Sequence, residues 1–171
     1  MNDSPLPAWV FARLADGEFH SGQALAADLG VTRSAIWKAA EALRALGVEM
    51  QAVRNRGYRL AAASEPLDAA RIRDALSPAT RAAVTSLDVV WTCRSTNDEL
   101  LEHPAPLAGT TAIMLSEHQS AGRGRRGRKW VAPPGAAICM SFSWTFPELP
   151  RDLSALSLVV GVLYGDRKSV V

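Results

Sequence analysis

Residues 122–130 read Gly-Arg-Gly-Arg-Arg-Gly-Arg-Lys-Trp, and no other run of the chain is as informative. Five cations and three glycines alternate within the first eight of these positions. Glycine has no Cβ, so the backbone can turn its N–H groups inward and approach a ligand closely. Arginine adds forked, permanently charged donors that suit phosphate and carboxylate oxygens. The run is therefore typical of a loop that wraps a bound anion.

The flanking segments argue against the alternative interpretation, which is a basic linker or an arginine–glycine nucleic-acid patch. Residues 110–116 and 136–144 are rich in apolar and small side chains, as buried strands are. Flexible linkers rarely lie between two core strands, whereas ligand-binding loops often do. We therefore expect an ordered anion-binding loop between two buried strands.

Two motifs carry a resemblance to a known family. Residues 119–130 resemble the loop of biotin protein ligases that binds biotin and its adenylate, and Ser95-Thr96-Asn97 matches that family's second signature. The N-terminal segment resembles the DNA-binding domain of the bifunctional members, the biotin operon repressors. The resemblance covers about residues 1–165. It implies an α+β fold with an N-terminal winged helix-turn-helix and an incomplete mixed β-sheet catalytic domain of the class II aminoacyl-tRNA-synthetase type.

The first sixty residues carry the pattern of three helices and a hairpin. Helices are predicted over residues 8–14, 21–29 and 32–46, because Ser21 and Thr32 can cap two of them and glycines follow both. Ile36, Ala40 and Leu43 recur at helical spacing, as a core-facing stripe should. Strands over 48–54 and 57–60 flank Asn55-Arg56-Gly57, a hairpin signal. The expected domains are residues 1–62, a linker at 63–66, and part of the ligase domain at 67–165.

A winged helix of this kind predicts a DNA-binding surface, with the third helix in the major groove and the hairpin over phosphates. Winged helices also serve in protein–protein interaction, and exposed charges are often only solvated. Trp37 is compatible with packing against the wing or with touching DNA. Glu41 is expected on the same surface of the third helix, and Arg59 on the same surface of the hairpin. The side chains expected at DNA are Arg33, Ser34, Trp37, Lys38, Arg44, Arg54 and Arg56.

Composition sets broader limits. The chain has 171 residues, 48% of them apolar and 21% charged, which is ordinary for a soluble globular protein. A net charge of +2 is too small to indicate a polyanionic partner by itself. Cys93 and Cys139 lie in strand-like runs and are expected to be free core thiols, with a disulfide as the alternative. The first twenty residues are no signal peptide and no stretch has the length of a membrane span, so we expect a cytoplasmic protein.

Beyond the linker, Asp68 opens a helix that places Ile72, Ala75 and Leu76 on one side and that Ser77-Pro78 ends. A strand is predicted over 87–93 and a helix over 98–102. Ser95 and Thr96 lie between them, where helix capping alone explains both. The resemblance adds contact with the ring system of biotin, which capping does not exclude.

The resemblance implies the site and its ligands. Arg123 and Arg125 would be the catalytic residues, because they border the biotin carboxylate and the phosphate to which it is joined. The substrates would be biotin and ATP with Mg²⁺, and the partners a biotin carboxyl carrier protein, operator DNA and a second copy of the full-length chain. Trp130, from its position alone, is a loop-to-strand anchor. By resemblance, biotin contacts Ser95, Thr96, Asn97, Gln119, Arg123, Gly124 and Arg125, and ATP contacts Arg126, Arg128, Lys129 and Trp130.

No metal-ligand cluster or Cys/His nucleophile pair is evident in the sequence, and no role is assigned to His20, His103 or His118. His118 neighbours the loop and is expected to be an exposed filler.

The C-terminal part departs from the family. Residues 153–164 predict a helix, but no Lys-Trp-Pro-Asn-Asp motif, which carries a ligand-binding lysine in the family, occurs in this sequence. Residues 166–171 read as one frame of a common sequencing adapter, so we expect a non-native tail. These features indicate an incomplete, inactive fragment. The alternatives are a natural short form that keeps only DNA binding, and a ligand-sensing regulator without ligase activity.

Overall fold

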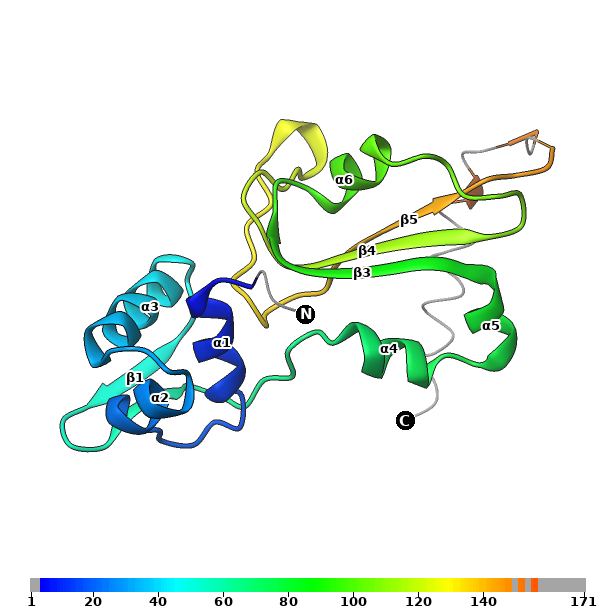
Figure 1. The fold of residues 1–171 in the computed structure, drawn as a ribbon. Helices are drawn as coiled ribbons and strands as arrows, with labels where there is room; N and C mark the ends of the chain where they lie inside the picture. The colour runs from blue at the N-terminus through cyan, green and yellow to red at the C-terminus, as the bar shows by residue number, and fades with distance from the viewer. Residues whose placement is uncertain (1–3, 149–150, 153–154, 157–171) are drawn as a thin grey trace, which may run out of the picture.

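The computed structural model describes residues 4–148, 151–152 and 155–156. Figure 1 shows two units along the chain: three helices with a hairpin, followed by a sheet with helices on both faces. The predicted α+β architecture is confirmed. Most of the predicted helix over residues 153–164, and the whole of the predicted tail over 166–171, lie outside the described residues.

The three N-terminal helices are α1 (Leu6–Arg13), α2 (Gly22–Asp28) and α3 (Arg33–Ala45). Both predicted caps are present: the Ser21 hydroxyl accepts the Ala24 N–H at 3.0 Å, and the Thr32 hydroxyl accepts the Ala35 N–H at 3.2 Å. Each cap satisfies a backbone donor that the first turn leaves open. The predicted stripe of α3 is buried, with Ala39 added to it.

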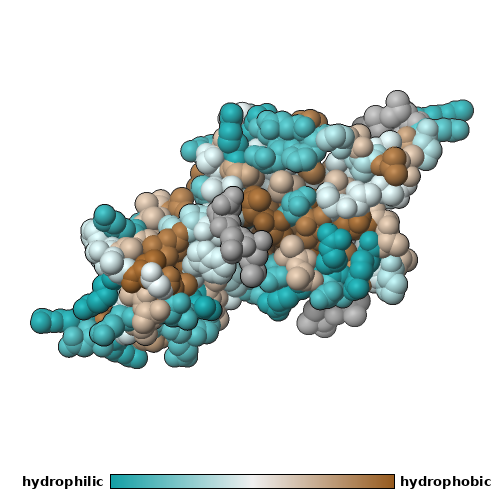
Figure 2. Space-filling view, in the orientation of Figure 1, coloured by the Kyte–Doolittle hydropathy of each residue, from teal (hydrophilic) through white to brown (hydrophobic). Residues whose placement is uncertain are grey.

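The hairpin consists of β1 (Met50–Val53) and β2 (Gly57–Leu60), which pair antiparallel. The predicted first strand, residues 48–54, was too long at both ends. Val48 is buried in the core, and its N–H donates to the Leu43 carbonyl at 3.1 Å, so it completes the end of α3. The space-filling view shows hydrophilic side chains gathered around the hairpin end of this unit (Figure 2).

The second unit contains a three-stranded mixed sheet in the order β3-β4-β5. β4 runs parallel to β3, and β5 runs antiparallel to β4. Two short helices precede the sheet and one connects its first two strands. The elements are α4 (Ala69–Ala75), α5 (Pro78–Ala83), β3 (Val84–Cys93), α6 (Thr96–Glu102), β4 (Thr111–Gln119), a 3-10 turn η1 (Arg125–Gly127) and β5 (Cys139–Trp144).

Three predicted boundaries in this unit were wrong. Ser77-Pro78 ends α4 but also starts the unpredicted α5, because the Ser77 hydroxyl caps the Thr80 N–H at 3.2 Å and Pro78 suits the first helical turn. β3 begins at Val84, and α6 begins at Thr96, directly after the capping residue Ser95. β5 begins at Cys139 because residues 133–136 form a turn closed by the Ala136 N–H and the Pro133 carbonyl.

The two faces of the sheet are covered unequally. α4 and α5 pack over β3, where Leu87, Ile113 and Leu115 form a core with side chains of α4. α6 packs over β4 and β5 on the other face. Residues 136–144 were predicted to be buried, and this is wrong for every second side chain of β5. Met140, Phe142 and Trp144 pair with residues on the α4 face but lie at the sheet edge beyond the helices, so they are exposed.

The two units touch through Phe11 of α1. Its ring lies 5.6 Å from the ring of Trp91 in β3, measured between centroids. A Cβ added to Gly135 would lie 2.8 Å from the Phe11 ring and 2.5 Å from the Ser64 hydroxyl. The linker is also fixed, because the Leu67 N–H donates to the buried carboxylate of Glu117 at 2.5 Å. Residues from both units therefore close around one aromatic ring.

Candidate functional site

Three segments bring polar side chains together where β3 ends. The Ser95 hydroxyl caps α6, and Thr96 follows it with only 3% of its surface exposed. Gln119 ends β4, and its Oε1 accepts the Thr96 backbone N–H at 2.8 Å and the Thr96 hydroxyl at 3.3 Å. The Thr96 hydroxyl also lies 2.8 Å from the hydroxyl of Ser141 in β5. The start of α6 is thus held to both neighbouring strands.

A cavity of about 390 Å³ opens beside this network. It contains six of the predicted site residues, drawn from the α6 start, the end of β4 and the arginine–glycine run. The sequence had not identified five further lining residues, of which four are consecutive in residues 138–141. The alternation of serine with apolar residues in that strand is a signal that one of its faces is polar. The cavity is lined by Ser95, Thr96, Asn97, Asp98, Gln119, Arg123, Trp130, Ile138, Cys139, Met140 and Ser141.

The arginine–glycine run forms a short hairpin. The Gly124 N–H donates to the Arg128 carbonyl at 2.6 Å, and the Trp130 N–H donates to the Gly122 carbonyl at 2.8 Å. A Cβ on Gly122 would lie 2.9 Å from the Trp130 carbonyl oxygen. Two of its glycines therefore allow the two arms of the hairpin to approach each other, rather than a ligand to approach the backbone. Gly127, at φ 72°, permits the turn at the tip.

The predicted cations of the run are not all gathered at the cavity. Arg123 lines it and donates to the Asp98 carboxylate of α6 at 2.7 Å. Trp130 lines it with half of its surface exposed. The remaining predicted residues follow the hairpin outward: Gly124 lies in its first arm, Arg126, Arg128 and Lys129 are exposed, and the side chain of Arg125 lies outside the described part of the structure.

Two titratable groups lie near the ends of β3 and β4. Burial raises the pKa of the Cys93 thiol, and both cysteines are free thiols, as expected. His118 is half-buried and within 3.2 Å of the Thr92 hydroxyl, so the prediction of an exposed filler was wrong. Burial, with a smaller effect of the Lys129 cation, lowers its pKa. Among the described residues, no group of three or more His, Cys, Asp or Glu side chains is placed to hold a metal ion.

We expect both cysteines to react slowly with iodoacetamide at pH 8. A raised pKa reduces the reactive thiolate fraction of Cys93, and Cys139 is only 5% exposed. Alkylation should be at least about tenfold slower than in urea, where both thiols are accessible. Mass spectrometry over time checks this, and alkylation at the urea rate in the native protein would contradict it.

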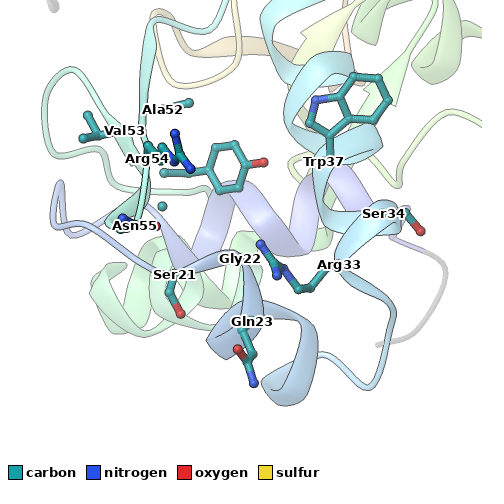
Figure 3. A pocket seen from close by; sticks show the side chains of 12 residues that line it. Ser21, Gly22, Gln23, Arg33, Ser34, Trp37, Ala52, Val53, Arg54 and Asn55 are labelled. Carbon is teal, nitrogen blue, oxygen red and sulfur yellow. The ribbon is translucent and has the colours of Figure 1, made fainter.

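A larger groove of about 830 Å³ lies on the N-terminal unit, between α3 and the hairpin. Figure 3 shows Arg33 and Trp37 on the α3 side of this groove and Arg54 on the hairpin side. Trp37 is 54% exposed, so it contributes to the groove rather than to the core. Of the predicted DNA-binding residues, the groove contains Arg33, Ser34, Trp37 and Arg54, and it adds Ser21, Gln23, Asn55 and Tyr58.

The other predicted DNA-binding residues have different surroundings. Lys38 is exposed on α3 outside the groove. The Arg56 guanidinium lies 4.0 Å above the ring of Phe19, and that of Arg59 lies 4.7 Å from the same ring. Arg44 pairs with Glu41 near the end of α3. The cationic surface is therefore centred on the start of α3 and on the hairpin.

Comparison with known proteins accounts for both units. Residues 10–59 match the HTH domain family, and residues 90–169 match the Biotin/lipoate A/B protein ligase family. The second unit is therefore similar to the biotin/lipoate A/B protein ligase family over most of its length. The arginine–glycine hairpin and the α6 start both fall within the residues that match the ligase family, and the groove falls within those that match the HTH family. The match extends to residue 169, and the non-native origin of residues 166–171 stays a prediction.

Several curated proteins are similar to the chain. The bifunctional ligase/repressor BirA of Salmonella typhimurium is 39% identical over 97% of this chain and 50% of its own length. The protein of the same name from Bacillus subtilis is 35% identical over 86% of this chain and 47% of its own length. A biotin--[acetyl-CoA-carboxylase] ligase of Mycobacterium tuberculosis is 39% identical over 57% of this chain and 37% of its own length. The chain thus spans about half the length of the curated relatives it matches most extensively. No helix among the described residues is long and apolar enough to cross a membrane.

Proposed function

We propose that this chain carries the biotin-binding and DNA-binding parts of a cytoplasmic biotin protein ligase that also represses transcription. One observation carries the ligase half of the proposal: Thr96, Gln119 and Ser141 form a connected polar network at a cavity that also contains Arg123. Biotin combines a cyclic urea, which needs paired donors and acceptors, with a carboxylate, which needs a cation. The cavity offers both kinds of group.

The reaction would join biotin to ATP. The biotin carboxylate attacks the α-phosphorus, pyrophosphate leaves, and biotinyl-5′-adenylate remains until a lysine amine of a biotin carboxyl carrier protein displaces AMP. The obstacle is the approach of two anions, so positive charge placed in advance lowers the barrier. Arg123 would supply this charge at the cavity, together with Arg125. Mg²⁺ would be bound chiefly through the phosphates of ATP, as is usual for this ion.

The hairpin would have a second role. Biotinyl-5′-adenylate is a mixed anhydride that water destroys, so a loop that covers it protects the product. Arg126, Arg128 and Lys129 would hold the phosphates of ATP, and Trp130 would stack on adenine. The Arg123–Asp98 pair holds the first arm of the hairpin to α6. We infer that Asp98 orients Arg123 toward the ligand.

The repressor half of the proposal rests on the groove of the HTH domain. α3 would enter the major groove of operator DNA, and the hairpin would lie along the phosphates. The full-length chain would bind as a homodimer, because two identical domains match a two-fold symmetric operator. Biotin-dependent pyrophosphate exchange by the full-length protein separates this proposal from a ligand-sensing regulator without ligase activity.

The ligase proposal is tested by calorimetry with Gln119→Ala. We expect the intact chain to bind biotin, and the variant to bind at least about tenfold more weakly, since it leaves the Thr96 N–H without its partner. Gln51→Ala is the matched control, because Gln51 lies in the hairpin of the HTH domain and bonds to Arg59. Absence of heat with both biotin and ATP would contradict the proposal.

The DNA-binding proposal is tested by the salt dependence of affinity for duplex DNA. We expect Arg33→Ala to weaken binding and to reduce the slope of log K against log salt by about 1, since one phosphate contact is lost. Arg13→Ala removes a charge from the same domain, but Arg13 pairs with Asp28 outside the groove. Equal changes of slope in the two variants would show that net charge, and not the groove, determines binding.

A further inference from the structure

The hydrogen bonds around Gln119 have one possible direction. A backbone N–H can only donate, so the atom of Gln119 that lies 2.8 Å from the Thr96 nitrogen must be its carbonyl oxygen. The amide NH₂ of Gln119 therefore occupies the other end of the side chain. Gln119 can present only donors to a ligand in the cavity.

The same logic orders the hydroxyl groups when every bond of the network forms. The Thr96 hydroxyl lies 3.3 Å from the Gln119 carbonyl oxygen, which only accepts, so the Thr96 proton is used in that bond. In the arrangement in which all of these bonds form, Thr96 accepts the bond that joins it to Ser141 at 2.8 Å, and Ser141 donates it. The Ser141 proton is thereby used within the protein. Ser141 can offer a ligand only the lone pairs of its oxygen.

The cavity wall therefore shows a donor from β4 beside an acceptor from β5. Thr96 is bonded to both Gln119 and Ser141 and so orients them. It is only 3% exposed, so water does not compete for its bonds. The cyclic urea of biotin carries the complementary set, because a carbonyl acceptor lies directly beside two N–H donors. A carboxylate or a hydrocarbon chain does not carry it.

We propose that Ser141 determines the specificity of the site by accepting a hydrogen bond from one ureido N–H of biotin. Gln119 donates to the ureido oxygen at the same time. This inference rests on the proposed function and goes beyond it, since it assigns a ligand contact to a strand that lies outside both recognised motifs. It also gives a reason why the polar face of β5 carries serine at this position.

The test is a thermodynamic cycle between protein and ligand, measured by calorimetry on the intact chain. The protein change is Ser141→Ala. The ligand change is a cyclic-carbamate analogue of biotin, in which oxygen replaces one ureido N–H. Two such analogues are used, one for each ureido nitrogen. We expect Ser141→Ala to weaken biotin binding about tenfold. One of the two carbamates should bind the unmutated chain at least about fivefold more weakly than biotin does. The same carbamate should bind Ser141→Ala as well as it binds the unmutated chain.

Ser143→Ala is the matched control. Ser143 lies on the same face of β5, one pair further along the sheet, and does not line the cavity. It should leave biotin affinity within about twofold of the unmutated chain. Ser141→Thr keeps the hydroxyl and should restore most of the affinity that alanine loses.

The outcomes distinguish a failure of the proposed function from a failure of the role of Ser141. Absence of biotin binding by the unmutated chain would overturn the proposed function and this inference with it. Biotin binding with additive losses in the cycle would overturn the role of Ser141 alone, because a merely structural serine weakens all three ligands equally. If Ser141→Ala fails to fold, the two carbamates still test the acceptor on the unmutated chain, and equal affinity of both with biotin would refute it.

Discussion

Gly57→Ala is expected to destabilise the HTH domain by more than about 3 kcal/mol. Gly57 has a φ of 101°, which side chains rarely adopt, and it lies where the hairpin closes on the segment before α2. A Cβ at this position would lie 2.0 Å from the His20 carbonyl oxygen and 2.6 Å from the Ser21 Cα. These are backbone atoms, and two hydrogen bonds of 2.8 and 2.9 Å between His20 and Tyr58 hold them there.

Gly30→Ala separates the cost of the positive φ from the cost of the clash with the His20 backbone. Gly30 also has a positive φ, 65°, but a Cβ there would meet no atom within 4 Å. It should cost only about 1 kcal/mol, the price of the conformation alone. Urea unfolding followed by circular dichroism measures both variants. Similar losses in the two would show that the clash with His20 is relieved by a small shift.

Phe11→Ala should lower the free energy of unfolding of the HTH domain by about 3–5 kcal/mol and loosen its contact with the ligase domain. Phe11 is 1% exposed in the core of three helices, yet its ring also meets Trp91 and lies close to Gly135. Alanine would leave a void shared by both domains. Besides the loss of stability, we expect trypsin to cleave faster near the linker, at Arg71.

Phe19→Ala is the control for this prediction. Phe19 is also an aromatic residue of the HTH domain, but it is only half-buried and its ring contacts the Arg56 and Arg59 guanidinium groups. Its loss should cost about 1 kcal/mol and leave cleavage near the linker unchanged. A Phe11→Ala protein that loses stability but keeps the native cleavage rate would show that Trp91 and Gly135 hold the domains together without it.

The N-terminal helices could be predicted because their signals are local. Ser21 and Thr32 bond within one turn of their own helices, and the buried stripe of α3 repeats at helical spacing. The burial of β5 could not be predicted in this way. Alternation along its sequence shows that the strand has two different faces, but not how far α4 and α5 extend across the sheet.

The motifs of the candidate site could be predicted from the sequence, but the contact that completes its polar network could not. Thr96 and Gln119 belong to recognisable segments, whereas Ser141 meets them only because β5 pairs with β4 in one register. The glycines of the hairpin illustrate a similar limit. Glycine indicates a close approach, and only the structure shows that the approaching atom is the Trp130 carbonyl. The contact of Phe11 with Trp91 joins positions eighty residues apart.

The two units are joined covalently once, at the linker, and meet again where residues 133–135 pack against the N-terminal unit. Leu67 is bonded to Glu117 beside the linker, and Gly135 fits against Phe11 on the segment that joins the hairpin to β5. Pro133 of the same segment lies beside the end of α3, because a Cβ added to Gly47 would be 3.0 Å from its ring. The segment that leaves the arginine–glycine hairpin therefore touches the N-terminal unit directly, and a displacement of residues 133–135 would reach both α1 and the end of α3.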